Sequence, residues 1–324
     1  MSIRRLVSAL GALAFAFTCN PALAQDFPTR PIKLIIAYAA GGTSDIIARL
    51  LAQAIEKNLG KPVVVENRPG GNGFIAAEAV MQSPADGHTL WIADNGHFAI
   101  NPALLAKVPY DPLTSFVPVT QVTRQDFYIV VNKDFPANTV AEMLALAKSK
   151  AGGLSYGTVG SASVHNLGFE RIKLQTGTNL VHIPYKGNAE LKPALLAGHI
   201  DMTVSTITGV SGELEAGTLK ALAYAGATRN PKTPNVPTFA EAGLGGIGID
   251  ISVGIFAPAG TPAPIVQFLQ KEFAKALNDA EVKKRNETFA FELIGSSSAE
   301  FVEKIRSDLA VYRKIVKDGN IKVD

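Results

Sequence analysis

Short apolar, β-branched runs alternate with segments of helical spacing along almost the whole chain. The first run spans 32–38 and breaks at two glycines, after which apolar residues recur three and four positions apart up to Leu59, before Gly60. Strands that alternate with helices predict an α/β fold with mostly parallel sheet. Ligands in such folds lie beyond the carboxyl ends of the strands. The expected strands are Ile32–Tyr38, Val63–Glu66, Thr89–Ala93, Phe127–Asn132, Leu154–Tyr156, Leu180–Ile183, Ile200–Ser205, Leu219–Tyr224 and Ile251–Phe256.

Three helices carry a clear pattern of their own. In Thr139–Lys150, Thr139 and Glu142 have the spacing of a capping box, in which each residue satisfies a backbone N–H at the helix start. Pro264–Leu277 and Ala299–Val316 each place their large apolar residues on one face. We expect these two C-terminal helices to cover a sheet.

The first 24 residues have the layout of a secretory signal. Two arginines precede an apolar stretch, Leu6–Thr18, that is too short to span a bilayer, and Ala22–Ala24 supplies a small-x-small cleavage pattern. The processed chain would begin at Gln25. It would contain no cysteine, because Cys19 is the only one, which excludes disulfides, thiol catalysis and cysteine-based metal clusters.

A lipoprotein signal is the alternative, but the positions before Cys19 are wrong for it. Such a signal has leucine three residues earlier and a small residue immediately before the cysteine, where this chain has Ala16 and Thr18.

The charge of the chain excludes a nucleic-acid partner. It has 31 Lys and Arg against 28 Asp and Glu, and loss of Arg4 and Arg5 with the signal leaves a net charge of about +1. A nucleic-acid-binding protein needs a concentrated basic face. The processed chain also lacks an apolar stretch of the ~20 residues that a membrane-spanning helix requires.

The loop Ala39–Asp45 stands at the first strand-to-helix junction. Its glycines allow backbone N–H groups to point at a ligand, and the helix dipole adds partial positive charge, so the loop is a candidate anion site. An ordinary tight turn explains the same residues. Thr43 or Ser44 would cap the helix, and Asp45 would either bind a ligand hydroxyl or amino group or complement the dipole.

A second loop of the same kind follows the strand at 154–156. Gly157–Ser163 combines glycines with hydroxyl side chains and leads into a helix over Val164–Leu174. Two such loops in different halves of the chain suggest two helix N-termini that face one ligand. His165 is better interpreted as a capping or packing residue than as a catalytic base.

Motifs for catalysis, metal binding and cofactor binding are absent or out of context. The histidines lack metal-ligand spacing, and the sequence contains neither a Gly-x-Ser-x-Gly elbow nor a Walker A loop. Gly243–Gly248 reads GxGxxG, but a strand follows it rather than precedes it, so a dinucleotide site is rejected. We therefore expect no catalytic residues, no metal and no cofactor.

Nine motifs recur in one order along the chain and carry a family resemblance. They are Phe27–Ile32, Ala40–Arg49, Val65–Gly73, Pro84–Leu90, Pro109–Pro112, Tyr156–His165, His182–Gly187, Val236–Gly243 and Ala257–Pro262. On these motifs the chain resembles the Bug family of periplasmic solute-binding receptors, which are associated with tripartite tricarboxylate transporters.

The resemblance implies a two-lobed, class II periplasmic-binding-protein fold with the ligand cleft between the lobes. Residues 1–24 would be the signal peptide, 25–122 with 253–324 the first lobe, and 123–252 the second. The chain would cross between lobes near Val122–Phe127 and near Asp250–Val253. In the family, a carboxylate is held by backbone N–H groups and waters between two loops, which match Ala39–Asp45 and Gly157–His165 here.

The chain departs from the family pattern at several positions. Ala37 and Tyr38 stand where the family has Pro-Phe, Ala162 narrows the second loop, and Asn95 follows a strand near the distal end of the expected pocket. The ligand therefore stays open between a dicarboxylate, an aromatic carboxylate, an amino acid and a neutral amide. The residues expected to bind it are Tyr38, Ala40, Gly41, Gly42, Thr43, Ser44, Asp45, Asn95, Gly160, Ser161, Ala162, Ser163, His165 and Ser205.

The resemblance implies a periplasmic, non-enzymatic binding protein. It would capture a small organic anion, with a dicarboxylate or an aromatic carboxylate favoured, by lobe closure and deliver it to membrane transporter subunits. A ligand sensor that reports to a membrane signalling protein is an alternative. A hydrolase-like cleft enzyme is a weaker one, since the sequence offers no catalytic set. We expect a monomer.

Overall fold

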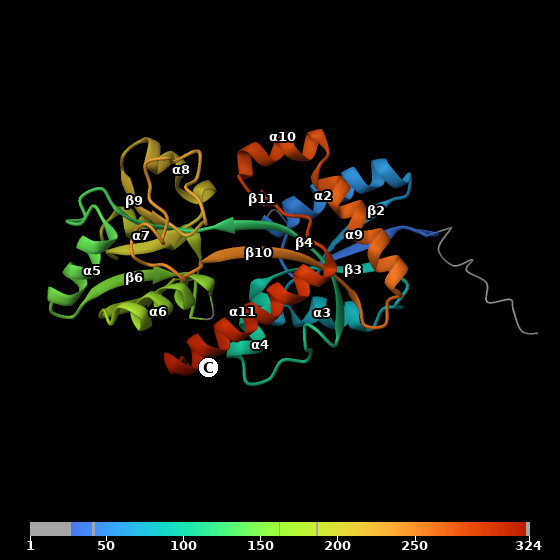
Figure 1. The fold of residues 1–324 in the computed structure, drawn as a ribbon, viewed down its shortest axis with the longest axis horizontal. Helices are drawn as coiled ribbons and strands as arrows, with labels where there is room; N and C mark the ends of the chain where they lie inside the picture. The colour runs from blue at the N-terminus through green and yellow to red at the C-terminus, as the bar shows by residue number, and fades with distance from the viewer. Residues whose placement is uncertain (1–26, 41–42, 162, 186, 322–324) are drawn as a thin grey trace, which may run out of the picture.

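Two β-sheets lie side by side, each covered by helices, and two long strands run between them (Figure 1). This fold is seen in a computed structural model that describes residues 27–40, 43–161, 163–185 and 187–321. The expected signal segment and the site candidates Gly41, Gly42 and Ala162 lie outside the described residues.

The first sheet has six strands in the order β11-β4-β10-β3-β1-β2. Its β2-β1-β3 part is parallel, whereas β10 pairs antiparallel with both β3 and β4, and β11 pairs antiparallel with β4. The strands are β1 Ile32–Ile36, β2 Val63–Asn67, β3 Thr89–Asp94, β4 Phe116–Asp126, β10 Asp250–Pro258 and β11 Glu292–Leu293.

The second sheet has five strands in the order β7-β6-β8-β5-β9. Here β7-β6-β8 is parallel, while β5 runs antiparallel to β8 and β9. The strands are β5 Tyr128–Asn132, β6 Leu154–Thr158, β7 Leu180–Pro184, β8 Met202–Ser205 and β9 Leu219–Tyr224.

The prediction of mostly parallel sheet is wrong, because both sheets are mixed. The antiparallel pairs involve the strands that carry the chain between the sheets. Strand β4 continues through Phe127 into β5, and β10 returns beside β4 in the opposite direction. Such a return cannot be read from local periodicity.

The helices cover both sheets and join successive strands (Figure 1). Two of them, α9 and α11, are the amphipathic C-terminal helices that the sequence predicts. The helices are α2 Thr43–Leu59, η2 Gly71–Gly73, α3 Phe74–Met81, η3 Gly96–Ile100, α4 Asn101–Leu104, α5 Val140–Ser149, α6 Val164–Thr176, α7 Asn188–Leu196, α8 Ile207–Glu215, α9 Ala263–Leu277, α10 Ala280–Phe289 and α11 Ser298–Asp318.

Helices bury both faces of the first sheet, and alternate side chains of each strand point to opposite faces. Leu34 and Ile36 of β1 pack in one cluster with α2 and α9. Ile35 packs in another cluster on the opposite face, together with Trp91 and with Phe301 of α11. Burial on both faces explains why β1 is apolar at every position except Lys33.

The predicted cap of α5 is formed in part. Thr139 Oγ1 accepts the N–H of Glu142 at 3.1 Å, but the Glu142 carboxylate accepts from Asn138 rather than from Thr139. A complete capping box starts α11, where Ser297 and Glu300 satisfy each other's backbone N–H groups. Within the described residues, no helix combines the length and apolar character needed to cross a membrane.

Candidate functional site

The carboxyl ends of the parallel strands in both sheets lead into the loops that the sequence analysis singled out. Strand β1 is followed by residues 37–43, and β3 by Asn95, in the first sheet. In the second sheet β6 leads to Gly160–Ser163, and β8 leads through Ser205 and Thr206 into α8. Ligands of open α/β folds bind at these ends.

In the first loop, Asp45 is engaged by protein partners. Its carboxylate is 3% exposed and accepts from the Arg49 guanidinium at 2.9 Å and from Asn67 Nδ2 at 2.9 Å. Asn67 Nδ2 also donates to the carbonyl of Tyr38 at 3.0 Å. The carboxylate thus ties the start of α2 to β2 and to the residue that precedes the loop. Ser44 is buried beside it, and Ala40 is exposed.

The hydroxyl of Tyr38 points at Asp94, although the residue as a whole is 41% exposed. Tyr38 donates to Asp94 Oδ2 at 2.7 Å, and His97 Nδ1 lies 2.9 Å from the other carboxylate oxygen. Burial of the hydroxyl and the charge of Asp94 raise the pKa of Tyr38 well above its usual value. Burial acts against ionisation of Asp94, but the interactions with His97 and the hydrogen bond from Tyr38 outweigh it and lower the pKa of Asp94. Tyr38 therefore stays protonated, and its O–H donates a hydrogen bond to Asp94.

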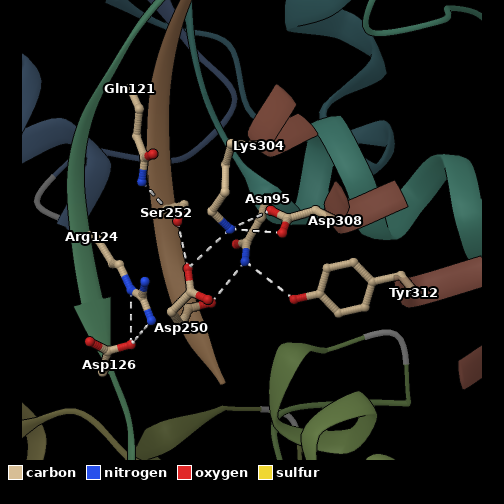
Figure 2. A network of polar contacts seen from close by, with 9 residues as sticks. All are labelled: Asn95, Gln121, Arg124, Asp126, Asp250, Ser252, Lys304, Asp308 and Tyr312. Carbon is tan, nitrogen blue, oxygen red and sulfur yellow. Dashed lines mark hydrogen bonds and ion pairs between the residues drawn. The ribbon is translucent and has the colours of Figure 1, made fainter. Parts of the chain in front are cut away.

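Asn95 holds the end of β3 against β10 and α11. Its side chain is 2% exposed, and Nδ2 donates to the carbonyl of Asp250 at 2.8 Å and toward Tyr312 Oη at 3.4 Å (Figure 2). This amide group links the end of β3 to β10 and α11.

A polar network surrounds this junction at the point where β4 and β10 leave the first sheet. Lys304 of α11 contacts both carboxylate oxygens of Asp308 at 2.7 Å and lies 3.9 Å from Asp250 (Figure 2). Asp250 also accepts from Ser252 Oγ at 2.5 Å, and Ser252 accepts from Gln121 Nε2 at 3.1 Å. Burial raises the pKa of Asp308 in spite of Lys304.

In the second loop, the hydroxyl of Ser163 caps α6. Ser163 Oγ accepts the N–H of Asn166 at 3.3 Å and donates to the carbonyl of Gly160 at 2.6 Å. The carbonyl of Ser161 accepts from Asn166 Nδ2 at 2.8 Å. The described part of this loop is therefore braced by internal hydrogen bonds.

A cavity of about 280 Å³ lies beside the strands that cross between the sheets. It brings together two of the expected site residues, His165 and Ser205. The other described candidates do not line it. Its lining consists of Gln125, Phe127, His165, Asn188, Leu191, Lys192, Leu195, Thr203, Val204, Ser205, Thr206, Thr208, Gly209, Val210, Leu219 and Ile251.

His165 is the most unusual polar group of the cavity. It is 8% exposed, its ring packs edge-on against Phe127 at 5.0 Å, and its Nδ1 has no hydrogen-bond partner among the residues that the structure describes. Burial lowers the pKa of His165 to about 4. The ring is therefore neutral at pH 7, as the packing interpretation implies.

Sequence reasoning missed the rest of the cavity. Thr206, Thr208 and Gly209 form a third hydroxyl- and glycine-containing helix start, directly after a predicted strand, and this signal was available. Gln125 and Ile251 reach the cavity through the crossing of the chain between sheets, which no local pattern indicates. Groups of three or more His, Cys, Asp or Glu side chains able to hold a metal are not found in the described residues.

The sequence matches a known family over most of its length. The family model described as "Tripartite tricarboxylate transporter family receptor" matches residues 47–321. The chain is 31% identical to the protein BugT of Bordetella pertussis over 284 residues, which cover 87% of each protein.

Solved structures share the fold. A Rhodopseudomonas palustris protein in a structure with adipate is 32% identical, with a TM-score of 0.78 over 92% of this chain and 99% of that one. MatC from the same organism, with bound malate, is 29% identical, with a TM-score of 0.74 over 90% of this chain and 100% of that one. The predicted periplasmic-binding-protein fold is thereby confirmed, and the chain belongs to the tripartite tricarboxylate transporter receptor family of periplasmic solute-binding proteins.

Proposed function

We propose that this protein captures a small carboxylate in the periplasm and hands it to the membrane subunits of a tripartite tricarboxylate-type transporter. The family is one of solute-binding receptors, and two relatives are seen with the carboxylates adipate and malate. In this proposal the protein binds its ligand and releases it chemically unchanged. Export would follow from the signal at residues 1–24.

The two sheets would act as two lobes that close on the ligand. The lobes would comprise residues 25–122 with 253–324, and residues 123–252. They are joined by β4 and β10, so a small change in these strands would rotate one sheet against the other. Closure driven by a ligand requires that the ligand contacts the closed state better than the open one.

The observation that carries the proposal is the start of three second-lobe helices at one cavity, beside the strands that join the lobes. The first turns of these helices contribute His165 of α6, Asn188 of α7 and Thr208 of α8 to the lining. The N-terminus of a helix offers N–H groups and partial positive charge to an anion. Each dipole contributes ~0.3–1 kcal/mol, rising to ~2 kcal/mol in a partly buried site.

A thermal-shift screen of the purified, processed protein tests the proposal. The panel contains carboxylates, amino acids and neutral amides at matched concentration. A carboxylate at about 100 times its dissociation constant adds ~2.7 kcal/mol to the free energy of unfolding. We expect a rise of several degrees in Tm for at least one carboxylate, and none for its amide. The proposal is contradicted if only amides raise Tm, or if none of the carboxylates raises it.

A further inference from the structure

The loop between β6 and α6 is held by hydrogen bonds to two of its carbonyl groups. The carbonyl of Gly160 accepts from Ser163 Oγ at 2.6 Å and from the Ser163 N–H at 3.2 Å. The carbonyl of Ser161 accepts from Asn166 Nδ2 at 2.8 Å. In a planar trans peptide, the C=O of one residue and the N–H of the next point in opposite directions. The N–H of Ser161 therefore points away from the donors that hold Gly160, and its direction depends on them.

A second support reaches Gly160 from the strand that precedes the loop. Thr158, the last residue of β6, is fully buried, and its Oγ1 accepts the N–H of Gly160 at 3.3 Å. The same oxygen lies 3.1 Å from the Gly160 carbonyl, to which it can donate its own proton. Gly160 has a φ of +116°, and glycine has the widest conformational freedom of any residue. The orientation of this peptide therefore depends on such contacts.

His182 of β7 is the partner of the Thr158 hydroxyl. Its Nε2 lies 2.6 Å from Thr158 Oγ1, and Tyr156 of β6 stands opposite His182 in the strand pairing. The two rings stack with their centroids 5.3 Å apart. The Tyr156 hydroxyl donates to Asn166 Oδ1 at 2.8 Å, and Asn166 holds the carbonyl of Ser161. One pair of cross-strand neighbours therefore supports both braced carbonyls of the loop.

The single proton of the Thr158 hydroxyl decides whether the support is complete. With a proton on Nε2, His182 donates to Thr158, and Thr158 donates to the Gly160 carbonyl. With no proton on Nε2, Thr158 donates to the ring, and its hydrogen bond to that carbonyl is lost. His182 therefore acts on the loop as a hydrogen-bond donor, through Thr158.

We infer that His182 is a positioning residue of the ligand site, which through Thr158 holds the Gly160 peptide in the orientation that binds a carboxylate. This inference rests on the proposed function, because it takes the loop at 160–163 as one of the two that contact the ligand. His182 itself does not need to touch the ligand. It sets the affinity by fixing the backbone that does.

The groups that face His182 determine how its charge follows the pH. Burial lowers the pKa of His182, whereas Glu170 of α6 acts against this and Lys173 of α6 adds to it. Glu170 and Lys173 are paired at 2.7 Å. Burial and the charge of Glu170 raise the pKa of Tyr156, which therefore stays neutral against the ring. As the pH falls, His182 gains a positive charge and a fixed proton on Nε2, and both changes favour an anion at the loop.

Amide hydrogen exchange, measured by NMR on the purified, processed protein without ligand, tests the support itself. His182→Phe keeps a ring but removes the donor, and Thr158→Val keeps the side-chain shape but removes the hydroxyl. In both variants the Gly160 amide should exchange ~5-fold faster or more, while amides within β6 and β7 keep their wild-type rates. His182→Gln restores an N–H donor near the position of Nε2 and should restore the exchange rate.

Calorimetric titration with adipate, malate and benzoate tests the effect on binding, and the acid that wild type binds most tightly is used for every variant. His182→Phe and Thr158→Val should each bind it ~10-fold more weakly. The double variant should also lose only ~10-fold, because both changes break one chain of hydrogen bonds. His182→Gln should bind nearly as wild type does. His199→Phe is the matched control, since His199 is exposed after α7.

The pH profile separates a positioning role from a purely structural one. The ratio of wild-type to His182→Gln affinity should rise ~2–5-fold between pH 8 and pH 5, because only the wild type gains the charge. The titration of the acid itself affects both proteins alike. Circular dichroism and Tm confirm that each variant is folded.

Three results would overturn the inference and leave the proposed function standing. They are wild-type affinity or unchanged Gly160 exchange in folded His182→Phe, a ratio that stays constant with pH, and losses that add in the double variant. If no carboxylate of the panel binds to wild type, the proposed function fails and the inference fails with it.

Discussion

At the scale of single residues, most of the described candidate site residues form hydrogen bonds with other groups of the same chain. Asp45, Asn95 and Ser163 hold a loop, a strand end and a helix start in place through hydrogen bonds. Tyr38 gives its hydroxyl to Asp94. His165 is the exception, because its buried Nδ1 has no partner among the described residues. Residue type in a loop predicted which side chains are polar and near the strand ends, but not which of them already have partners.

The buried, neutral state of His165 predicts a specific loss of stability in acid. Its pKa is about 4 in the folded protein and about 6.5 when unfolded, so below pH 6.5 the unfolded chain binds the proton more readily. Stability therefore falls as the pH drops from 6.5 toward 4, and the loss is complete below 4. Between pH 7 and pH 5 this residue alone should cost about 2 kcal/mol.

Urea unfolding of wild type and His165→Phe at both pH values measures this cost. Titrating carboxylates affect both proteins alike, so the difference between them isolates the histidine. Equal pH dependence in the two proteins would contradict the assigned state of His165.

At the scale of elements, the sequence predicts those parts that local patterns determine. The strand predicted over Leu219–Tyr224 has those bounds in the structure, and the strand predicted from Val63 is one residue longer. The long strand β4 was missed because Pro118 and several polar side chains interrupt its apolar pattern. Pro118 is tolerated because it lies at an irregularity in the pairing with β10, where a missing N–H costs little.

The contact between β10 and α11 predicts that a single added methyl will be destabilising. A Cβ on Gly254 would lie 2.0 Å from the ring of Phe301, which is fully buried. Gly254→Ala should therefore lower the free energy of unfolding by ~1–3 kcal/mol through overpacking. Combining it with Phe301→Leu should give less than the sum of the two single effects, as measured by urea unfolding. Strict additivity would show that the two residues do not share this contact.

Two ion pairs on α11 allow the contribution of the junction network to the free energy of unfolding to be measured. Lys304–Asp308 and Lys314–Asp318 have the same spacing, but the lysine side chains are 24% and 77% exposed. Lys304→Met removes the nearest cation of Asp308 and Asp250 from a largely buried site and should cost ~1–3 kcal/mol. Lys314→Met is the control and should change the free energy of unfolding by less than ~0.5 kcal/mol. Equal losses in the two variants would mean that the network near Asp250 adds nothing to the junction.

At the scale of the whole molecule, the proposed function depends on the two sheets and on the strands β4 and β10 that join them. The resemblance to periplasmic receptors anticipated this architecture, whereas periodicity alone predicted only strands and helices in alternation. The cavity combines residues from β4, α6, α7, α8 and β10, which are far apart in the sequence. Such a set depends on tertiary packing, and for this reason only His165 and Ser205 were identified beforehand.

Closure of the lobes predicts a change in overall dimensions on binding. Small-angle X-ray scattering of the purified protein should give a smaller radius of gyration with a saturating carboxylate, the one that raises Tm most in the thermal-shift screen, than without ligand. The same concentration of the corresponding amide should leave the radius of gyration at its ligand-free value. An unchanged radius of gyration at saturation, with binding shown by calorimetry, would contradict closure while leaving binding intact.

The central claim is that the site selects a carboxylate. Calorimetric titration with the carboxylate that raises Tm most in the thermal-shift screen, and with its amide, tests it most directly, because the two compounds share one carbon skeleton and differ in the charge of the head group. We predict that the carboxylate binds at least ~10-fold more tightly, since hydrogen bonds to a charged group are worth ~1.5–3 kcal/mol. Equal affinities, or tighter binding of the amide, would contradict the account.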